Sequence, residues 1–219
     1  MSAVRIGTRG STLALWQANH VKKLLEAAGC ARVVVNAHYL ADMVAQHLAV
    51  RQSPAITLSR EDALLETGGG VLNALPLLDE FFYVVNSDIF WLDGMVPALV
   101  RLARAFDPAR HDAVLLLQRT VTALGYEGSG DFIIDPFGRI RRRGEREIAP
   151  HLFAGVQLLS KRLFAGTSPG KFSLNPLYDR AIAAQRLIAI VHDGEWYHIG
   201  TPQGLAATEE RLASHRIER

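Results

Sequence analysis

The sequence predicts an α/β fold with a central, mostly parallel sheet flanked by helices and a small antiparallel portion. Short, fully apolar segments alternate along the chain with segments whose apolar residues recur at helical spacing. In residues 81–88, five apolar and aromatic residues run directly into Asn86, Ser87 and Asp88. Apolar runs of this kind are typical of buried strands. A polar tip after such a run indicates the carboxyl end of a strand, where open α/β folds bind their ligands.

The first half of the chain alternates strand and helix patterns. We expect a strand over residues 4–7 and a helix over 13–28, which Ser11 and Thr12 cap and Gly29 ends. A strand at 31–36, a short helix at 40–48 and a strand at 55–58 follow. The glycine triplet at 68–70 then precedes a helix predicted over 71–78.

The second half continues the alternation after the strand that ends near Asp88. The pattern predicts a helix at 95–105, a strand at 112–118, a hairpin at 130–140 whose turn is 135–138, a strand at 153–159, a helix at 176–185, a strand at 188–192 and a helix at 202–213. No internal repeat, low-complexity tract or linker interrupts the sequence. We therefore expect a single domain over residues 1–219.

Composition excludes several classes of protein. The 219 residues are 49% hydrophobic and 21% charged with a net charge of +2, which argues against a dedicated nucleic-acid binder. The single Cys30 excludes an internal disulfide and a multi-cysteine zinc site, and fits a reducing compartment. No run of 18 apolar residues and no signal-peptide pattern is present. We expect a cytoplasmic protein with neither a membrane nor a nucleic-acid partner.

From about Ala31 to the C-terminus the chain resembles the sugar-1-phosphate nucleotidylyltransferases, most closely those of the N-acetylmuramate-1-phosphate uridylyltransferase type. The resemblance rests on blocks that follow the family's order, at residues 35–40, 64–70, 85–88, 130–132, 153–156, 172–175 and 196–201. It implies a Rossmann-like nucleotide-diphospho-sugar transferase fold. It also implies transfer of a nucleoside monophosphate, UMP from UTP above all, to a sugar 1-phosphate, with Mg²⁺ as the cofactor.

The resemblance assigns roles to residues around the strand end. Asp88 matches the family's metal aspartate and is the expected catalytic Mg²⁺ ligand, since Mg²⁺ prefers carboxylate oxygens and retains waters; the alternative is a turn cap. Gly68, Gly69 and Gly70 match the segment that lies against the nucleotide base; the alternative is helix packing. Asn86 belongs to the same expected binding set.

Four further residues are assigned with structural alternatives beside them. Asp131 and Gly155 match positions near the sugar and the ribose, although a hairpin aspartate is often only solvated. Glu147 is a candidate for the sugar end, or one charge of the solvated run 139–147. His198 stands where the family commonly has a second metal aspartate; it is expected either to hydrogen-bond a phosphate or metal-bound water, or to be a satisfied core histidine.

The N-terminus departs from the nucleotidylyltransferase pattern. That family opens with a long glycine-rich loop followed by a Pro-Lys pair, whereas here no Pro-Lys pair exists. Only Gly7, Thr8, Arg9 and Gly10 stand in its place, so we assign Arg9 a catalytic role and Gly7 and Thr8 a binding role.

Residues 4–18 instead resemble the opening of hydroxymethylbilane synthase, a likeness that runs to about Gly29. That family attaches its cofactor through a downstream cysteine that this chain lacks, so deaminase activity is not expected. Residues 1–29 are thus an atypical strand-helix unit in place of the usual phosphate loop, a change that costs on the order of 5 kcal/mol of transition-state stabilisation. Three hypotheses stay open: a nucleotidylyltransferase, active or impaired; a non-catalytic nucleotide- or sugar-phosphate-binding protein; and a folded chimera without activity. The sequence leaves the oligomeric state open.

Overall fold

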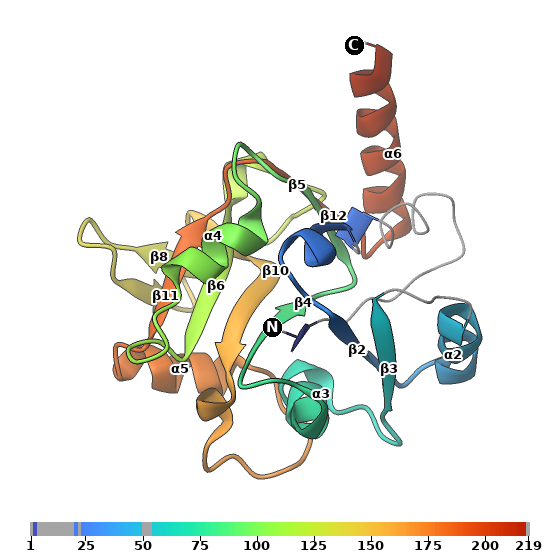
Figure 1. Cartoon of the computed structure of the whole chain (residues 1–219). Coiled ribbons are helices and arrows are strands. Elements are labelled where there is room, and N and C mark those ends of the chain that lie inside the picture. The colour runs from blue at the N-terminus through green and yellow to red at the C-terminus, as the bar shows by residue number, and fades with distance from the viewer. Residues whose placement is uncertain (1, 4–19, 22, 50–53, 218–219) are drawn as a thin grey trace.

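The structure is a computed structural model that describes residues 2–3, 20–21, 23–49 and 54–217 (Figure 1). Its strands are β1 (Ser2–Ala3), β2 (Arg32–Ala37), β3 (Ala55–Arg60), β4 (Phe81–Val85), β5 (Ile89–Leu92), β6 (Ala113–Arg119), β7 (Ala123–Leu124), β8 (Phe132–Ile134), β9 (Ile140–Arg142), β10 (His151–Ser160), β11 (Leu187–Val191) and β12 (Glu195–His198). Its helices are α2 (Ala41–Ala49), α3 (Glu66–Ala74), α4 (Ala98–Ala105), α5 (Asn175–Ala183) and α6 (Pro202–Ile217), with short 3₁₀ turns at Leu75–Leu77, Thr120–Thr122 and Lys161–Phe164. The strand expected at 4–7 and most of the first half of the helix expected at 13–28 lie outside the described residues, whereas residues 20, 21 and 23–27 are helical as predicted.

The large sheet has the strand order β11-β6-β10-β4-β1-β2-β3. Strand β10 is antiparallel to both of its neighbours, β4 and β6, and the other adjacent pairs along this order are parallel. The hairpin β8–β9 joins the sheet through β10. The prediction of a mostly parallel mixed sheet with a small antiparallel portion is confirmed.

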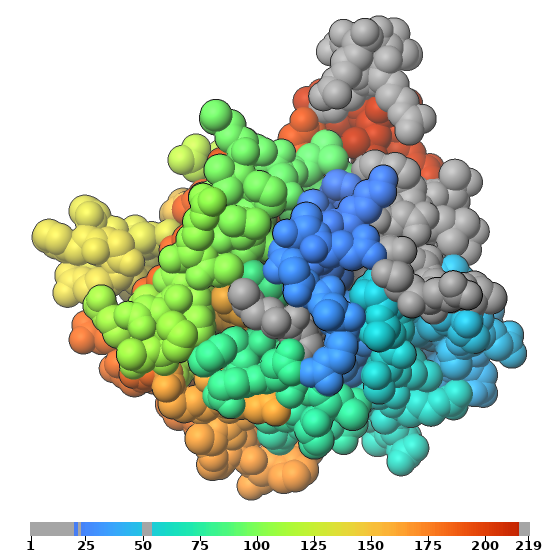
Figure 2. Space-filling model, viewed as in Figure 1, coloured from blue at the N-terminus to red at the C-terminus, as the bar shows by residue number. Residues whose placement is uncertain are grey.

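Helices cover both faces of this sheet, and the strands divide their side chains between the two faces. Tyr83 and Val85 pack with the helix that ends at residue 27 and with α4, while Phe82 and Val84 pack with α3 and α5. The strand period of two explains this division, because successive residues point to opposite faces. The space-filling view shows the first of these helices (blue) lying against the chain around α4 (green), and the β8–β9 hairpin (yellow) forming a lobe at one side (Figure 2).

A second, three-stranded sheet has the order β5-β12-β7, and the sequence patterns did not predict it. Its strand β5 begins directly after Asp88 and is separated from β4 by only the three residues 86–88, so the sequence did not mark it as a strand of its own. Phe90 and Tyr197 of this sheet form a small core that packs against α6. Helix α6 extends from this core away from the rest of the molecule (Figure 1).

Two predicted helix boundaries are wrong. Helix α4 begins at Ala98 rather than at 95, because Pro97 disfavours helical geometry in the residue before it. Helix α3 begins at Glu66 rather than at 71, so the three glycines lie inside the helix and not in a loop before it. Among the helices built from described residues, none is both long and apolar enough to cross a bilayer.

Candidate active site

Asp88 lies in the tight turn that joins β4 to β5, just beyond the carboxyl end of β4. Two backbone hydrogen bonds hold this turn: the Asn86 N–H donates to the Gly155 carbonyl (2.7 Å), and the Ile199 N–H donates to the Asp88 carbonyl (2.8 Å). The turn therefore joins the middle of β10 and the end of β12. The sequence-predicted residues Asn86, Asp88, Gly155 and His198 are brought together here.

His198 faces Asp88 across this turn. Its Nε2 lies 3.8 Å from the Asp88 Oδ2, and the two side chains are 31% and 51% exposed. The separation exceeds a hydrogen bond, so both groups keep access to a third partner. The imidazole stacks on Trp196, with ring centroids 6.4 Å apart and planes inclined by 13°. Because Trp196 is itself fixed by donating Nε1–H to the Ala154 carbonyl (2.9 Å), His198 has a defined orientation.

The donor set fits a magnesium ion that arrives with its substrate. Within the described ranges, no group of three or more histidine, cysteine or acidic side chains is arranged to hold a metal ion. Mg²⁺ in proteins is commonly held by one or two carboxylates, with substrate phosphates and waters completing the octahedron. A half-exposed Asp88 carboxylate at a strand end meets this requirement without a dedicated protein cage.

Gly155 permits the close approach of β10 to the turn. Its φ of +76° is unfavourable for any residue with a side chain, and an added Cβ would lie 2.9 Å from Ile89 Cγ1 and 3.2 Å from the Asn86 Cβ. The pairing of β10 with β6 changes register between Phe153 and Gln157, so the strand bulges at this position. A glycine is thus required at this position of β10, because the strand packs closely against the turn that carries Asn86 and Asp88.

A cavity of about 330 Å³ opens beside β10, between the β8–β9 hairpin and α5. It is lined by Asp131, Phe132, Arg142, Arg143, Glu145, Phe153, Asn175 and Tyr178. The predicted residue Asp131 is one of these lining residues, and its Oδ2 accepts a hydrogen bond from the Phe153 N–H (2.8 Å). Of the other lining residues, Phe153, Phe132 and Asn175 fall within the sequence blocks of the resemblance, but none of them was predicted as a site residue.

Tyr178 is a buried lining residue of this cavity. Its hydroxyl donates to Oε1 of the fully buried Gln157 (2.6 Å), and burial raises the pKa of the phenol well above its ordinary value. No sequence pattern indicates this pair, since Tyr178 and Gln157 lie on different elements and meet only in the folded chain.

Glu147 does not line this cavity. Its carboxylate accepts both terminal nitrogens of Arg141 and the Gly144 N–H. The hydrogen bonds from Arg141 lower the pKa of Glu147 to about 2. Glu147 therefore stabilises the loop between Arg141 and Glu147 itself. Its expected contact with the sugar stays a prediction.

The glycines of α3 are buried against the chain itself. An added Cβ on Gly68 would lie 2.5 Å from the Phe172 ring, one on Gly69 would lie 2.1 Å from the Gly170 carbonyl oxygen, and one on Gly70 would lie 2.6 Å from Glu61 Oε1. Packing with this loop and with Glu61 thus explains why no side chain fits. The expected contact of these glycines with a nucleotide base stays a prediction.

Asn36 and Glu61, neither of which was predicted as a site residue, tie α3 to the sheet. Asn36 Nδ2 donates to Glu61 Oε1 (3.0 Å) and to the Gly70 carbonyl (2.6 Å). Asn36 falls within one of the sequence blocks, but nothing marked Glu61. Gly7, Thr8 and Arg9 lie outside the described residues, so their roles stay predictions.

Two sequence comparisons match overlapping parts of the chain. The family model for the dipyromethane cofactor binding domain of porphobilinogen deaminase matches residues 4–67, well beyond the expected end near Gly29. The N-acetylmuramate alpha-1-phosphate uridylyltransferase of Caulobacter vibrioides is 38% identical over 201 residues, which cover 89% of this chain and 83% of that protein.

Solved structures share the fold at low sequence identity. HddC from Yersinia pseudotuberculosis, complexed with GMP-PN, superimposes with a TM-score of 0.70 at 18% identity, covering 97% of this chain and 100% of that one. A UDP-glucose pyrophosphorylase complexed with UDP-glucose gives a TM-score of 0.72 at 14% identity, covering 91% and 87% of the two chains. These likenesses confirm the nucleotide-diphospho-sugar transferase fold. Together with the extent and identity of the Caulobacter match, they show that this chain belongs to the sugar-1-phosphate nucleotidylyltransferase family.

Proposed function

We propose that this protein transfers UMP from UTP to N-acetylmuramate 1-phosphate. The sugar phosphate oxygen attacks the α-phosphorus of UTP, the bond from that phosphorus to the bridging oxygen breaks, and pyrophosphate leaves. The named activity of the 38% identical relative supports the choice of substrates. The observation that carries the proposal is the Asp88 turn, which holds a half-exposed carboxylate two residues beyond a backbone bond to β10.

In this proposal Asp88 would hold Mg²⁺. The ion would supply neutralisation of phosphate charge, the main requirement of phosphoryl-type transfer. His198, held on Trp196 at 3.8 Å from the Asp88 carboxylate, is placed to hydrogen-bond a phosphate oxygen or a metal-bound water. Asn86 and Gly155 form the adjoining wall, on the side we assign to the ribose.

The sugar 1-phosphate occupies the cavity lined by Asp131 and Tyr178. This cavity adjoins the turn of residues 86–88, which we call the metal turn. Phe153 on the cavity wall precedes Gly155 by two residues on β10, or about 7 Å of extended strand, and the Gly155 carbonyl accepts the Asn86 N–H of the turn. The phosphate of the sugar then points toward Asp88, and the rest of the ring lies under the β8–β9 hairpin. UTP and sugar phosphates are intracellular metabolites, so we place the reaction in the cytoplasm.

We further propose that the chain forms one nucleotidyltransferase-like domain and that residues 1–29 limit its rate of UMP transfer. No Pro-Lys pair exists in the chain, and Gly7, Thr8 and Arg9 take over phosphate binding with fewer contacts. Each lost donor to a developing charge costs about a hundredfold or more in rate. The same absence favours a second candidate function, a nucleotide- or sugar-phosphate-binding protein that does not transfer UMP.

Pyrophosphate release from UTP and N-acetylmuramate 1-phosphate, measured with and without Mg²⁺, tests the proposal. Asp88→Asn removes the metal ligand, and Asp42→Asn is the matched control, because Asp42 is an exposed carboxylate on α2 that only pairs with Arg60. We expect Asp88→Asn to lower the rate at least a hundredfold and the control to keep it.

A thermal shift with UTP and Mg²⁺ distinguishes the two candidate functions. Stabilisation that depends on Asp88 without pyrophosphate release supports the binding protein. If a version with a restored glycine-rich loop then releases pyrophosphate, the N-terminal segment is the cause of the inactivity. No stabilisation of the natural chain, together with no effect of Asp88→Asn, rejects both functions.

A further inference from the structure

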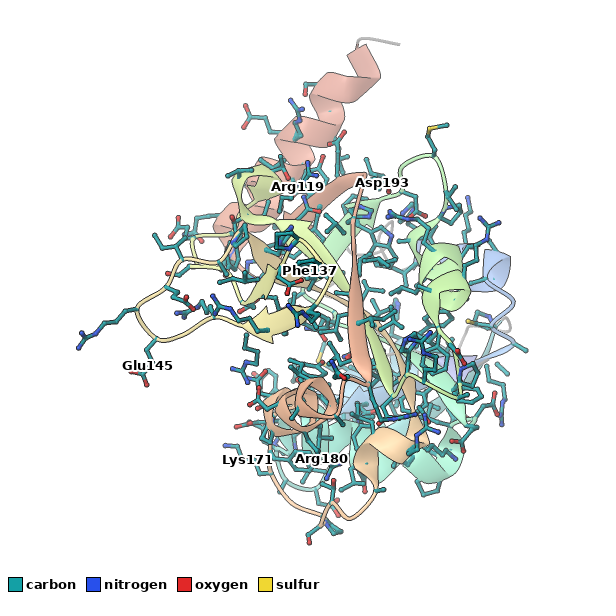
Figure 3. The ribbon with its side chains drawn as sticks, turned by 90° about the vertical axis from the view of Figure 1, so that its left-hand side faces the viewer. Arg119, Phe137, Glu145, Lys171, Arg180 and Asp193 are labelled. Carbon is teal, nitrogen blue, oxygen red and sulfur yellow. The ribbon has the colours of Figure 1, made fainter. Side chains whose placement is uncertain are left out.

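The cavity between the β8–β9 hairpin and α5, in which we place the sugar 1-phosphate and which we call the acceptor cavity, has the size and lining of a small-molecule site, with two arginines on its wall. Its volume of about 330 Å³ falls within the range of small-ligand pockets. Phe132 and Phe153 supply aromatic surface, each packing at its edge against Tyr178 with centroids 6.5 and 6.2 Å apart. Asn175 and Asp131 add polar groups suited to sugar hydroxyls. Figure 3 shows the loop that carries Glu145 on the same side of the molecule as α5.

The two guanidinium groups of the cavity differ in how their nitrogens are used. Arg143 is engaged by the backbone: Nε donates to the Gly130 carbonyl (2.7 Å), and Nη1 lies within reach of the carbonyls of Gly144, Glu145 and Glu147. Arg143 therefore holds the loop beside the cavity through two of its nitrogens, and within the described residues only Nη2 has no partner, so it does not offer a two-nitrogen edge to a ligand.

Arg142 keeps one edge of its guanidinium available. Only Nη1 is engaged, by the carboxylate of Asp179 on α5 at 3.2 and 3.4 Å. Within the part of the chain that the structure describes, Nε and Nη2 of Arg142 have no hydrogen-bond partner. Strand alternation turns Arg142 inward and Arg141 outward, since Ile140 is buried, Arg141 exposed and Arg142 half-buried. The Nε–Nη2 edge is the geometry that accepts a carboxylate through two parallel hydrogen bonds.

N-acetylmuramate 1-phosphate carries two anionic groups, one on C1 and one on C3 of its ring. One is the phosphate that reacts; the other is the carboxylate of the lactyl ether, which N-acetylglucosamine 1-phosphate lacks. If the phosphate lies at the Asp88 turn, the second anion needs its own cation on the cavity wall. The two carboxylates of the lining, Asp131 and Glu145, are balanced by the two guanidinium groups of Arg142 and Arg143, so the charge of the lining does not by itself exclude an anion.

We propose that Arg142 determines acceptor specificity by binding the lactyl carboxylate through its Nε–Nη2 edge, with Asp179 fixing its orientation. The inference rests on the proposed function in that it places the acceptor in this cavity. It goes beyond that function in naming the residue that distinguishes a sugar 1-phosphate with a lactyl carboxylate from the same sugar phosphate without one. Arg142 contacts a part of the acceptor that does not react, so its effect falls on binding.

Calorimetric titration of the two sugar phosphates tests this in the full chain without requiring turnover. The variants are Arg142→Gln and, as the matched control, Arg139→Gln. Arg139 also pairs with an aspartate of the hairpin, Asp135, but its side chain is 68% exposed and lies outside the cavity. Melting temperatures of both variants check that the fold is kept.

We expect the natural chain to bind N-acetylmuramate 1-phosphate about tenfold to a hundredfold more tightly than N-acetylglucosamine 1-phosphate, as a charge-assisted bidentate contact implies. Arg142→Gln removes most of this preference and changes the affinity for N-acetylglucosamine 1-phosphate by less than about threefold. Arg139→Gln keeps the preference.

Equal losses for both sugars in Arg142→Gln overturn the proposal, because they show a structural role. No preference in the natural chain, or a preference that survives Arg142→Gln, overturns it as well. A preference that depends on Arg142 in a chain that releases no pyrophosphate rejects the proposed transfer but supports the assignment of Arg142.

Discussion

Replacing Gly69 by alanine separates two explanations of the glycines in α3. On helix propensity alone the change stabilises, since alanine is favoured over glycine by about 1 kcal/mol inside a helix. The structure predicts the opposite sign, because the new Cβ would lie 2.1 Å from the Gly170 carbonyl oxygen. That neighbour is backbone, so no rotamer change relieves the contact.

The magnitude follows from what must move. Reaching an ordinary contact of 3.4 Å requires the Gly170 loop and α3 to separate by roughly 1.3 Å. This separation strains the Gly69 N–H bond to the Phe172 carbonyl and the Phe172 N–H bond to the Leu65 carbonyl, both 3.1 Å. Each such bond contributes about 1 kcal/mol and overpacking costs about 1–3 kcal/mol. After the helix gain, the net loss is about 2–4 kcal/mol, or about 4–16 °C in Tm for a chain of this size.

Urea and thermal unfolding measure this loss, with Asn73→Ala as the control. Asn73 is exposed on the same helix and donates one long hydrogen bond, 3.4 Å to Ser59 Oγ, so its replacement is expected to change the free energy of unfolding by less than about 1 kcal/mol. A Gly69→Ala variant as stable as the natural chain, or more stable, refutes the packing argument. Unchanged stability with weaker UTP binding would instead assign the glycine to the nucleotide.

Three other substitutions test the fold. Burial lowers the pKa of His192 below its ordinary 6.5, so the unfolded chain takes up a proton first on acidification. The free energy of unfolding then falls below about pH 6.5 by up to about 1.4 kcal/mol per pH unit for this group, and urea titrations at several pH values are expected to show a shallower slope in His192→Gln. Asp112→Ala leaves Arg162 and Arg186 without their shared, largely buried carboxylate, and is expected to lower stability in urea by about 2–3 kcal/mol; no loss would contradict a structural role. Gly155→Ala forces a side chain onto a φ of +76°, so we expect a lower Tm and a weaker Asp88-dependent shift with UTP and Mg²⁺; an unchanged shift would detach Gly155 from the metal turn.

Local patterns were sufficient where a segment's own residues determine its structure. Strand β4 was predicted because five apolar residues precede a polar tip, and the β8–β9 hairpin because residues 135–138 have the sequence of a turn. In the structure Gly138 of this turn has a φ of +79°. Asp88 was located correctly beyond a strand end for the same reason.

Long-range contacts explain what the sequence did not reveal. The glycines of α3 resemble a helix break in the sequence, because Phe172 and Gly170, which exclude their side chains, lie about a hundred residues downstream. The acceptor cavity combines the β8–β9 hairpin, β10 and α5, so no single segment carries its signature. Strand β5 was hidden because it continues the apolar run of β4 after only three residues.

The parts of the site come from two regions of the chain that differ in the families they match. The metal turn, the acceptor cavity and the Trp196–His198 stack all lie between residues 81 and 200, within the nucleotidylyltransferase pattern. The residues assigned to the triphosphate lie at 7–9, within the segment that matches the porphobilinogen deaminase model. The acceptor selection proposed for Arg142 and the metal binding proposed for Asp88 therefore do not involve residues 7–9, whereas the proposed transfer does. On these proposals, we expect the affinity for the sugar and the rate of transfer to be separable, with only the rate depending on the segment that replaces the phosphate loop.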